Sequence, residues 1–198
     1  MISKDRSYRS FEIRASEETN IIEGYAVVFD TAETMYEYDG IAYKEEIRSG
    51  AFTKADMKDV VLNFNHSGKP VARTKNNTLE LLIDQRGLFV KADLSGTEEG
   101  RKLYEEVKGG YLDKMSFAFT INSEEYNRDT RTRSVTEVKR LFDVAIVDIP
   151  AYESTSVMAR SFFKVEAEKE LTEVRKAEQQ VKQFVFETET IILMGGIK

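Results

Sequence analysis

Short runs of β-branched and aromatic residues recur along the chain, and they constrain its fold more than any other feature. The clearest are IIEGYAVVFD (21–30), VVLNFN (60–65), KMSFAFTI (114–121) and VKRLFDVAIVDI (138–149). Runs of this length and composition, bounded by polar or glycine-containing segments, are typical of β-strands. LELLID (79–84) and GLFVKADL (87–94) add two more runs, and the intervening turn predicts a hairpin. The sequence therefore predicts a mostly β, α+β protein.

Helices are expected at only a few places. TEEGRKLYEEVKGG (97–110) carries Thr97 as N-cap, acidic residues in the first turn and a Gly-Gly stop. Ser49 is a candidate N-cap for a short helix over 51–57. The Tyr-rich stretch up to Gly40 and the charged segment NSEEYNRDTRTR (122–133) are expected to be loops. Pro150 is expected to end the strand before it, because proline cannot donate to a ladder.

The composition changes after about residue 160, which predicts a domain over 1–160 and a helical extension over 161–198. Apolar residues recur there at spacings near three, four and seven: Ala167, Leu171, Val174, Val181 and Phe184. Such a stripe is typical of an amphipathic helix, packed either on its own domain or against another chain, including a second copy. The last stretch, 184–198, alternates like a strand and fits a removable tail or a strand added to a partner.

Composition excludes several classes of protein. The 198 residues contain no cysteine and a single histidine, so disulfides, thiol catalysis and a transition-metal site are not expected. The net charge of −6 is spread along the chain without a basic stripe, which argues against nucleic-acid binding. No apolar stretch approaches the length of a membrane span, and the polar start is unlike a signal peptide, so a cytoplasmic protein is expected.

Three residues are candidates for chemistry. His66 is the only histidine, Ser116 lies on the small-residue face of its predicted strand, and Asp143 interrupts an apolar strand. A buried carboxylate is costly unless it is paired, so a histidine or arginine is its natural partner. Serine, histidine and an acid are the residues of a nucleophile, a base and its orienting group. Each also has a structural interpretation, and Asp148 before the Pro150 turn is a second candidate acid.

Six blocks in a consistent order resemble the prohead maturation proteases of tailed phages, serine peptidases distantly related in fold to herpesvirus assemblin. They are GYAVVFD (24–30), EEIRSGAF (45–52), VLNFNH (61–66), LELLIDQRGLFVKADL (79–94), GGYLDKMSFAF (109–119) and LFDVAIVDIPAY (141–152), and the resemblance covers roughly residues 10–160. It implies a small closed or nearly closed β-barrel with surrounding helices. It assigns His66 as general base, Ser116 as nucleophile and Asp143 as the residue that orients His66. The family commonly has Glu and Ser where this chain has Asp143 and Ala145.

The resemblance also implies a function. The chain would be packaged inside the prohead in the host cytoplasm. It would cut the scaffolding segment of the major capsid protein, other prohead proteins and itself, without a cofactor. By analogy with assemblin, backbone N–H groups near Lys139–Arg140 would form the oxyanion hole. A catalytically silent scaffold or capsid-assembly module on the same barrel is the alternative. A generic β-barrel binding protein explains neither the ordered blocks nor Asp143.

Overall fold

The computed structural model describes residues 7–16, 20–148 and 157–195. The chain forms two compact units, Met1–Arg160 and Ser161–Lys198, and each is described here by itself. The expected strand end at Pro150 lies outside the described residues.

The first unit is built on one ten-stranded sheet. In chain order its strands are β1 (Ser7–Ala15), β2 (Ile21–Val28), β3 (Glu33–Tyr38), β4 (Ile41–Ile47), β5 (Val61–Phe64), β6 (Ser67–Arg73), β7 (Leu79–Ile83), β8 (Gly87–Asp93), β9 (Lys114–Asn127) and β10 (Thr132–Val147). A 3-10 turn spans Thr74–Asn76, and helix α1 spans Glu98–Lys108. The main path through the sheet runs β3-β4-β10-β9-β1-β2-β8-β7.

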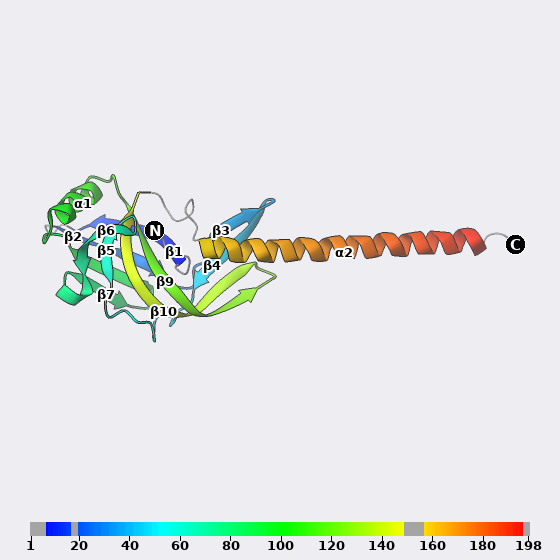
Figure 1. The fold of residues 1–198 in the computed structure, drawn as a ribbon, viewed down its shortest axis with the longest axis horizontal. Helices are drawn as coiled ribbons and strands as arrows, with labels where there is room; N and C mark the ends of the chain where they lie inside the picture. Colours follow the sequence, from blue (N-terminus) through cyan, green and yellow to red (C-terminus); the bar gives the residue numbers. More distant parts are fainter. Residues whose placement is uncertain (1–6, 17–19, 149–156, 196–198) are drawn as a thin grey trace. The chain divides into compact units, whose positions relative to one another are not determined.

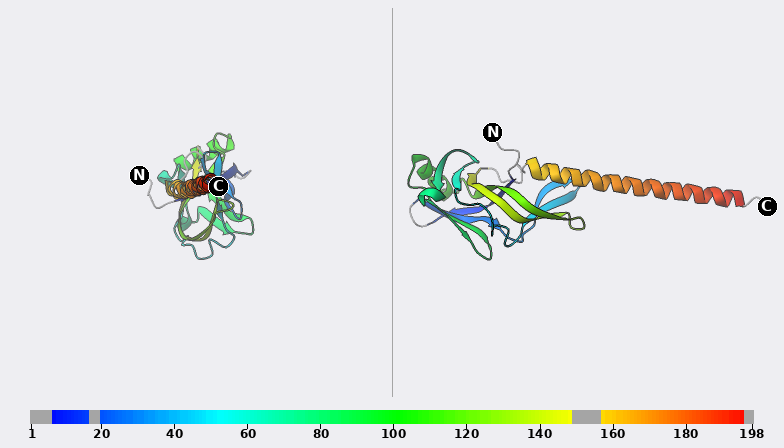
Figure 2. Two further views of the ribbon diagram at one scale, coloured as in Figure 1. Left: turned by 90° about the vertical axis from the view of Figure 1, so that its right-hand side faces the viewer. Right: turned by 60° about the horizontal axis from the view of Figure 1, so that its bottom comes forward.

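The strand β10 organises this sheet. It pairs antiparallel with β9 along one edge. On its other edge, β4 pairs in parallel with its first part and β5 with its last part, and β6 extends the sheet from β5. Four register shifts interrupt the β9–β10 ladder, and irregularities of this kind bend strands and increase their twist. Figures 1 and 2 show the resulting curl of the sheet.

The sheet is nevertheless open, so the expected closed or nearly closed barrel is wrong. Its main path ends at β3 and β7, and among the described residues these two strands do not pair with each other. Of the expected surrounding helices, α1 is the one that the described part of this unit contains. It packs against β1, β2 and β6.

Buried apolar side chains of the sheet and of α1 form the core. Along each strand they alternate with side chains that point to the other face, as the two-residue period requires. Fully buried members include Ile22, Leu62, Leu88, Val90, Phe117, Phe119, Val144 and Ile146. On β9, the opposite face carries Ser116 and Ala118.

Two predicted elements, a β-hairpin and a helix, are present in the structure. β7 and β8 form the predicted hairpin, and α1 follows its predicted cap. The Thr97 hydroxyl accepts a hydrogen bond from the Gly100 N–H, which satisfies one of the free amides of the first turn.

The predicted helix over 51–57 is wrong. The backbone there forms successive tight turns, in which the amides of Ala51, Thr53 and Ala55 each bond the carbonyl three residues earlier. Gly50 has φ +87°, which breaks helical geometry at the expected first turn. Ala51 and Phe52 are buried in the core, so tertiary packing holds this segment in place.

Two expected loops are strands instead. The Tyr-rich stretch contains β3, which turns into β4 at Asp39-Gly40, where both residues have positive φ as a tight hairpin requires. The charged segment 122–133 is mostly the distal part of the β9–β10 hairpin, with its turn at 128–131. There the buried Arg133 pairs with Glu45 and Glu124, so charged residues are accommodated within the sheet.

The described part of the second unit is formed by one long helix, whose first residues, 157–160, belong to the first unit. α2 spans Val157–Gly195, so the strand-like alternation over 184–198 did not predict its structure as far as residue 195. The surrounding sequence is rich in Glu, Lys and Gln, which favour helices, and the described part of this stretch continues the same helix. Val174, Val181 and Phe184 of the predicted stripe are exposed.

Candidate active site

The structure brings His66, Ser116 and Asp143 together. The Nε2 atom of His66 lies 2.9 Å from the Ser116 hydroxyl oxygen, and its Nδ1 atom lies 2.5 Å from Oδ1 of Asp143. Ser116 and Asp143 are 2% and 4% exposed. These residues are 50 and 77 positions from His66 along the chain, so only the fold can assemble them.

Strand register explains why Ser116 and Asp143 meet the same imidazole. Ala145 on β10 is paired with Ser116 on β9, and Asp143, two residues before Ala145, is paired with Ala118. Paired residues and residues two apart on one strand share a face of the sheet. The serine and the carboxylate therefore project from the same face, opposite the core, on neighbouring strands.

His66 reaches this face from a tight turn. Phe64 at the end of β5 pairs with Ser67 at the start of β6, which leaves Asn65 and His66 as a two-residue loop. Their φ angles are +49° and +54°, the left-handed conformation that two-residue hairpins of this type require at both positions. Asparagine and histidine tolerate this conformation better than most residues.

Asn65 fixes the turn against β10. Its backbone N–H donates to the carbonyl of Ile146 at 2.9 Å, and its Oδ1 accepts from the backbone N–H of Asp148 at 3.3 Å. The sequence gives no sign of this role, because β6, with the sequence SGKPVAR, lacks the pattern of a strand and a hairpin at Asn65 is therefore not indicated.

The same contacts distinguish the two candidate acids. Asp143 lies at the imidazole, whereas Asp148 is exposed and meets the His66 turn through its backbone N–H. In the tautomer whose Nδ1–H donates a hydrogen bond to the Asp143 carboxylate, Nε2 carries no proton and accepts a hydrogen bond from the Ser116 hydroxyl. The arrangement is able to move a proton from serine to histidine beside a fixed negative charge.

The expected oxyanion hole near Lys139–Arg140 is wrong. Arg140 is paired with Thr120, four residues along β9 from Ser116. At the rise of an antiparallel strand this separation is about 13 Å, far beyond a hydrogen bond to an oxyanion at Ser116. The N–H of the next residue, Leu141, donates to the carbonyl of Asp56.

An ion pair closes the base of the hairpin that carries His66. Arg73, the last residue of β6, donates from Nε and Nη2 to the two carboxylate oxygens of Asp59, at 2.7 and 2.8 Å. Lys75 adds a contact of 2.9 Å. The hydrogen bonds from Arg73 and then Lys75 hold the pKa of Asp59 far below its usual range.

This pair gives a testable pH dependence. Since the folded-state pKa of Asp59 is lowered, its stabilising contribution is present above its unfolded value of about 4 and is lost as pH falls through the folded value. We expect Asp59→Asn to lower the melting temperature at pH 7, and the difference from wild type to shrink progressively below pH 4. Melts followed by circular dichroism between pH 7 and 2 measure this. Asp39→Asn, in an exposed turn that suits either residue, is the matched control; a constant Asp59→Asn difference down to pH 2 would contradict the prediction.

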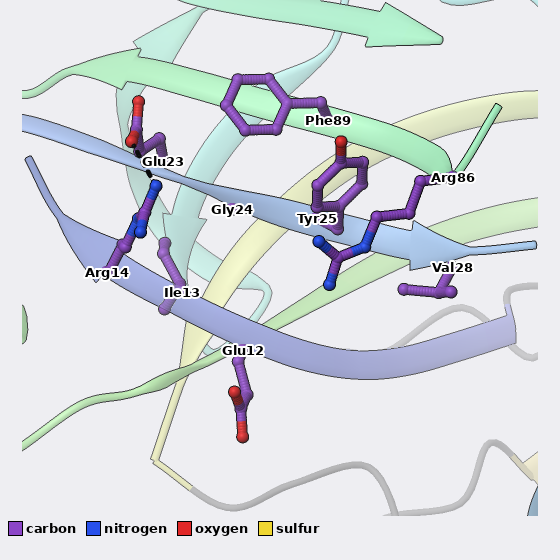
Figure 3. A pocket seen from close by; sticks show the side chains of 9 residues that line it. All are labelled: Glu12, Ile13, Arg14, Glu23, Gly24, Tyr25, Val28, Arg86 and Phe89. Carbon is purple, nitrogen blue, oxygen red and sulfur yellow. Dashed lines mark hydrogen bonds and ion pairs between the residues drawn. The ribbon is translucent and has the colours of Figure 1, made fainter. Parts of the chain in front are cut away.

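A cavity of about 450 Å³ lies elsewhere on the sheet. β1 pairs with β2 only over Ile13–Ala15, and the cavity forms where the two strands diverge. Figure 3 shows Tyr25, Arg86 and Phe89 grouped there, while Glu12 points away from them. The hydrogen bond from Tyr25 to Asp84 raises the pKa of the Tyr25 phenol. None of the three candidate catalytic residues lines this cavity.

The described residues contain neither a metal-binding cluster nor a membrane-spanning helix. No group of three or more His, Asp or Glu side chains there is arranged to hold a metal ion. In the same part of the chain, neither helix has a stretch long and apolar enough to cross a membrane.

Comparison with known proteins agrees with the geometry. The sequence profile of the caudovirus prohead serine proteases matches residues 9–170. The prohead protease of Enterobacteria phage HK97 is 26% identical over 164 residues, which cover 80% of this chain and 68% of that protein. No solved structure matches the chain. Because the profile spans most of the chain, including all three residues of the Ser-His-Asp arrangement, the protein belongs to the caudovirus prohead serine protease family.

Proposed function

We propose that this chain cuts the scaffolding segment of the major capsid protein, other prohead proteins and itself, through an acyl-enzyme on Ser116. Family membership makes it a serine peptidase of phage capsid maturation. The observation that carries the proposed acyl-enzyme on Ser116 is the continuous hydrogen-bonded series from Asp143 through His66 to Ser116.

The geometry supports a two-step hydrolysis. His66 Nε2 takes the Ser116 proton as the serine oxygen attacks the scissile carbonyl carbon, and the imidazolium then gives that proton to the leaving nitrogen. Water attacks the resulting ester, His66 takes its proton, and the proton returns to Ser116. Asp143 holds the Nδ1–H tautomer and stabilises the imidazolium in both steps.

Co-expression with the phage's major capsid protein tests the proposal. Wild-type protein should produce discrete capsid-protein fragments and a shortened protease, both absent with Ser116→Ala, when fragments are identified by mass spectrometry. Intact capsid protein in assembled shells with wild type would instead support the catalytically silent assembly module. Cleavage of capsid protein without shortening of the protease would remove self-cleavage from the proposal.

We further propose that α2 associates with a second copy of itself. Val174, Val181 and Val185 are exposed, and their spacings of seven and four match the seam of a two-stranded coiled coil. The family match ends at residue 170, which supports a role for the rest of α2 outside the peptidase fold.

Removal of residues 171–198 should therefore leave a folded, active peptidase that no longer self-associates. Sedimentation analysis reports the association, while circular dichroism and peptide cleavage report fold and activity. Val181→Lys in the full chain should also abolish association, because it places a charge in the seam, whereas Gln179→Lys, on a different side of the helix, should not. An unfolded truncation would show that the domain needs more of α2 than the family match covers.

A further inference from the structure

Asn63 on β5 has a buried side chain whose oxygen lacks a hydrogen-bond partner in the described part of the chain. The residue is 7% exposed, and its Oδ1 atom is buried without a donor among the described residues. A buried acceptor that gives up water without gaining a donor destabilises the folded protein, and most are satisfied. A valine or leucine would fit this strand without that cost.

Asn63 is in line with the candidate nucleophile. Ala145 on β10 is paired with Ser116 on one side and with Asn63 on the other, so the three side chains lie in one row on one face. Two strand spacings place Asn63 about 10 Å from Ser116. The methyl group of Ala145 is the only side chain of the row between them.

The proton transfer to the leaving nitrogen determines which part of a bound substrate lies on the Asn63 side of Ser116. His66 gives its proton to the leaving nitrogen, so the residues after the scissile bond leave Ser116 on the His66 side. His66 follows β5 in the same hairpin, and β5 lies on that side of β10. Asn63 therefore lies on the side of the leaving part of the peptide.

We propose that Asn63 is a substrate-binding residue, whose Oδ1 accepts a hydrogen bond from a main-chain N–H on the leaving side of the scissile bond. The inference rests on the proposed function of the Ser116 site. A main-chain N–H is present in peptide substrates at every residue except proline, so the contact anchors the chain without selecting a side chain. The unpaired acceptor is then satisfied when substrate is bound.

The test uses a ten-residue peptide spanning the first capsid-protein bond mapped in the co-expression experiment. Asn63→Val removes the acceptor, and Asn63→Thr has the same shape as valine but keeps an oxygen that accepts. We expect kcat/KM to fall about tenfold for Asn63→Val and by less than about threefold for Asn63→Thr. The melting temperature of Asn63→Val should equal or exceed that of wild type, because an unsatisfied buried group is removed.

N-methylation of the peptide identifies the partner. Methylating each leaving-side nitrogen in turn should lower kcat/KM about tenfold at one position with wild type, and cause no such loss at that position with Asn63→Val. The proposal would be overturned if Asn63→Val had the same kcat/KM as wild type. It would also be overturned if that methyl group lowered kcat/KM equally for wild type and Asn63→Val. If Asn63→Val does not fold, the same methylation series with Asn63→Thr and wild type decides, since a response that is uniform along the peptide contradicts a single contact. Labelling of Ser116 by a fluorophosphonate separates the two levels: an unlabelled wild-type serine refutes the proposed function, whereas a labelled enzyme insensitive to Asn63 refutes only this inference.

Discussion

Ser116→Ala and His66→Asn are each expected to lower peptide cleavage by at least about 10⁴-fold, with the fold retained. Each change removes one end of the proton transfer across the 2.9 Å contact between Nε2 and the hydroxyl. Asparagine is a better replacement than alanine at position 66, because the backbone there has φ +54° and asparagine tolerates that conformation. Single-turnover cleavage of the capsid peptide and circular dichroism measure the two effects.

The double variant sharpens this test. Nucleophile and base act as one unit, so Ser116→Ala with His66→Asn should be no slower than either single variant. A single variant that keeps more than about one hundredth of wild-type activity would exclude that residue from the role assigned to it.

Asp143→Asn is expected to lower kcat by about 10³- to 10⁴-fold, because the amide no longer favours the Nδ1–H tautomer or stabilises the imidazolium. The carboxylate oxygen lies 2.5 Å from Nδ1, and asparagine has nearly the same shape. Labelling of Ser116 by a fluorophosphonate should slow as well. Both rates are measured in folded protein.

Asp148→Asn is the matched control for this experiment. Asp148 is exposed and contacts the His66 turn through its backbone N–H, which the substitution keeps, so activity should stay within about twofold of wild type. Loss of cleavage in Asp148→Asn with a normal Asp143→Asn would reverse the assignment of the acid. Normal activity in both would mean a Ser-His dyad.

Local sequence pattern predicted secondary structure correctly where capping residues or alternating apolar residues lie within the segment itself. Thr97 and the glycines at 109–110 delimit α1, and the alternating runs locate β2, β5, β7 and β8. It was a poor guide where distant contacts decide. Ala51 and Phe52 are held in turns by burial rather than by helical bonds, and the polar residues of the β9–β10 hairpin form strand because each strand has the other as partner.

For the site, the amino-acid sequence supplies the candidate residues: one histidine, a serine on a small-residue strand face, and two acids near the end of one strand. Their arrangement comes from the fold. Pairing of Ala145 with Ser116 sets the serine and Asp143 on one face, and the left-handed Asn65-His66 turn brings the imidazole over it. Register between strands and the hand of a turn depend on contacts between residues far apart in the chain. The choice of Asp143 over Asp148, the remoteness of Lys139–Arg140 and the open sheet could therefore be read only from the folded protein.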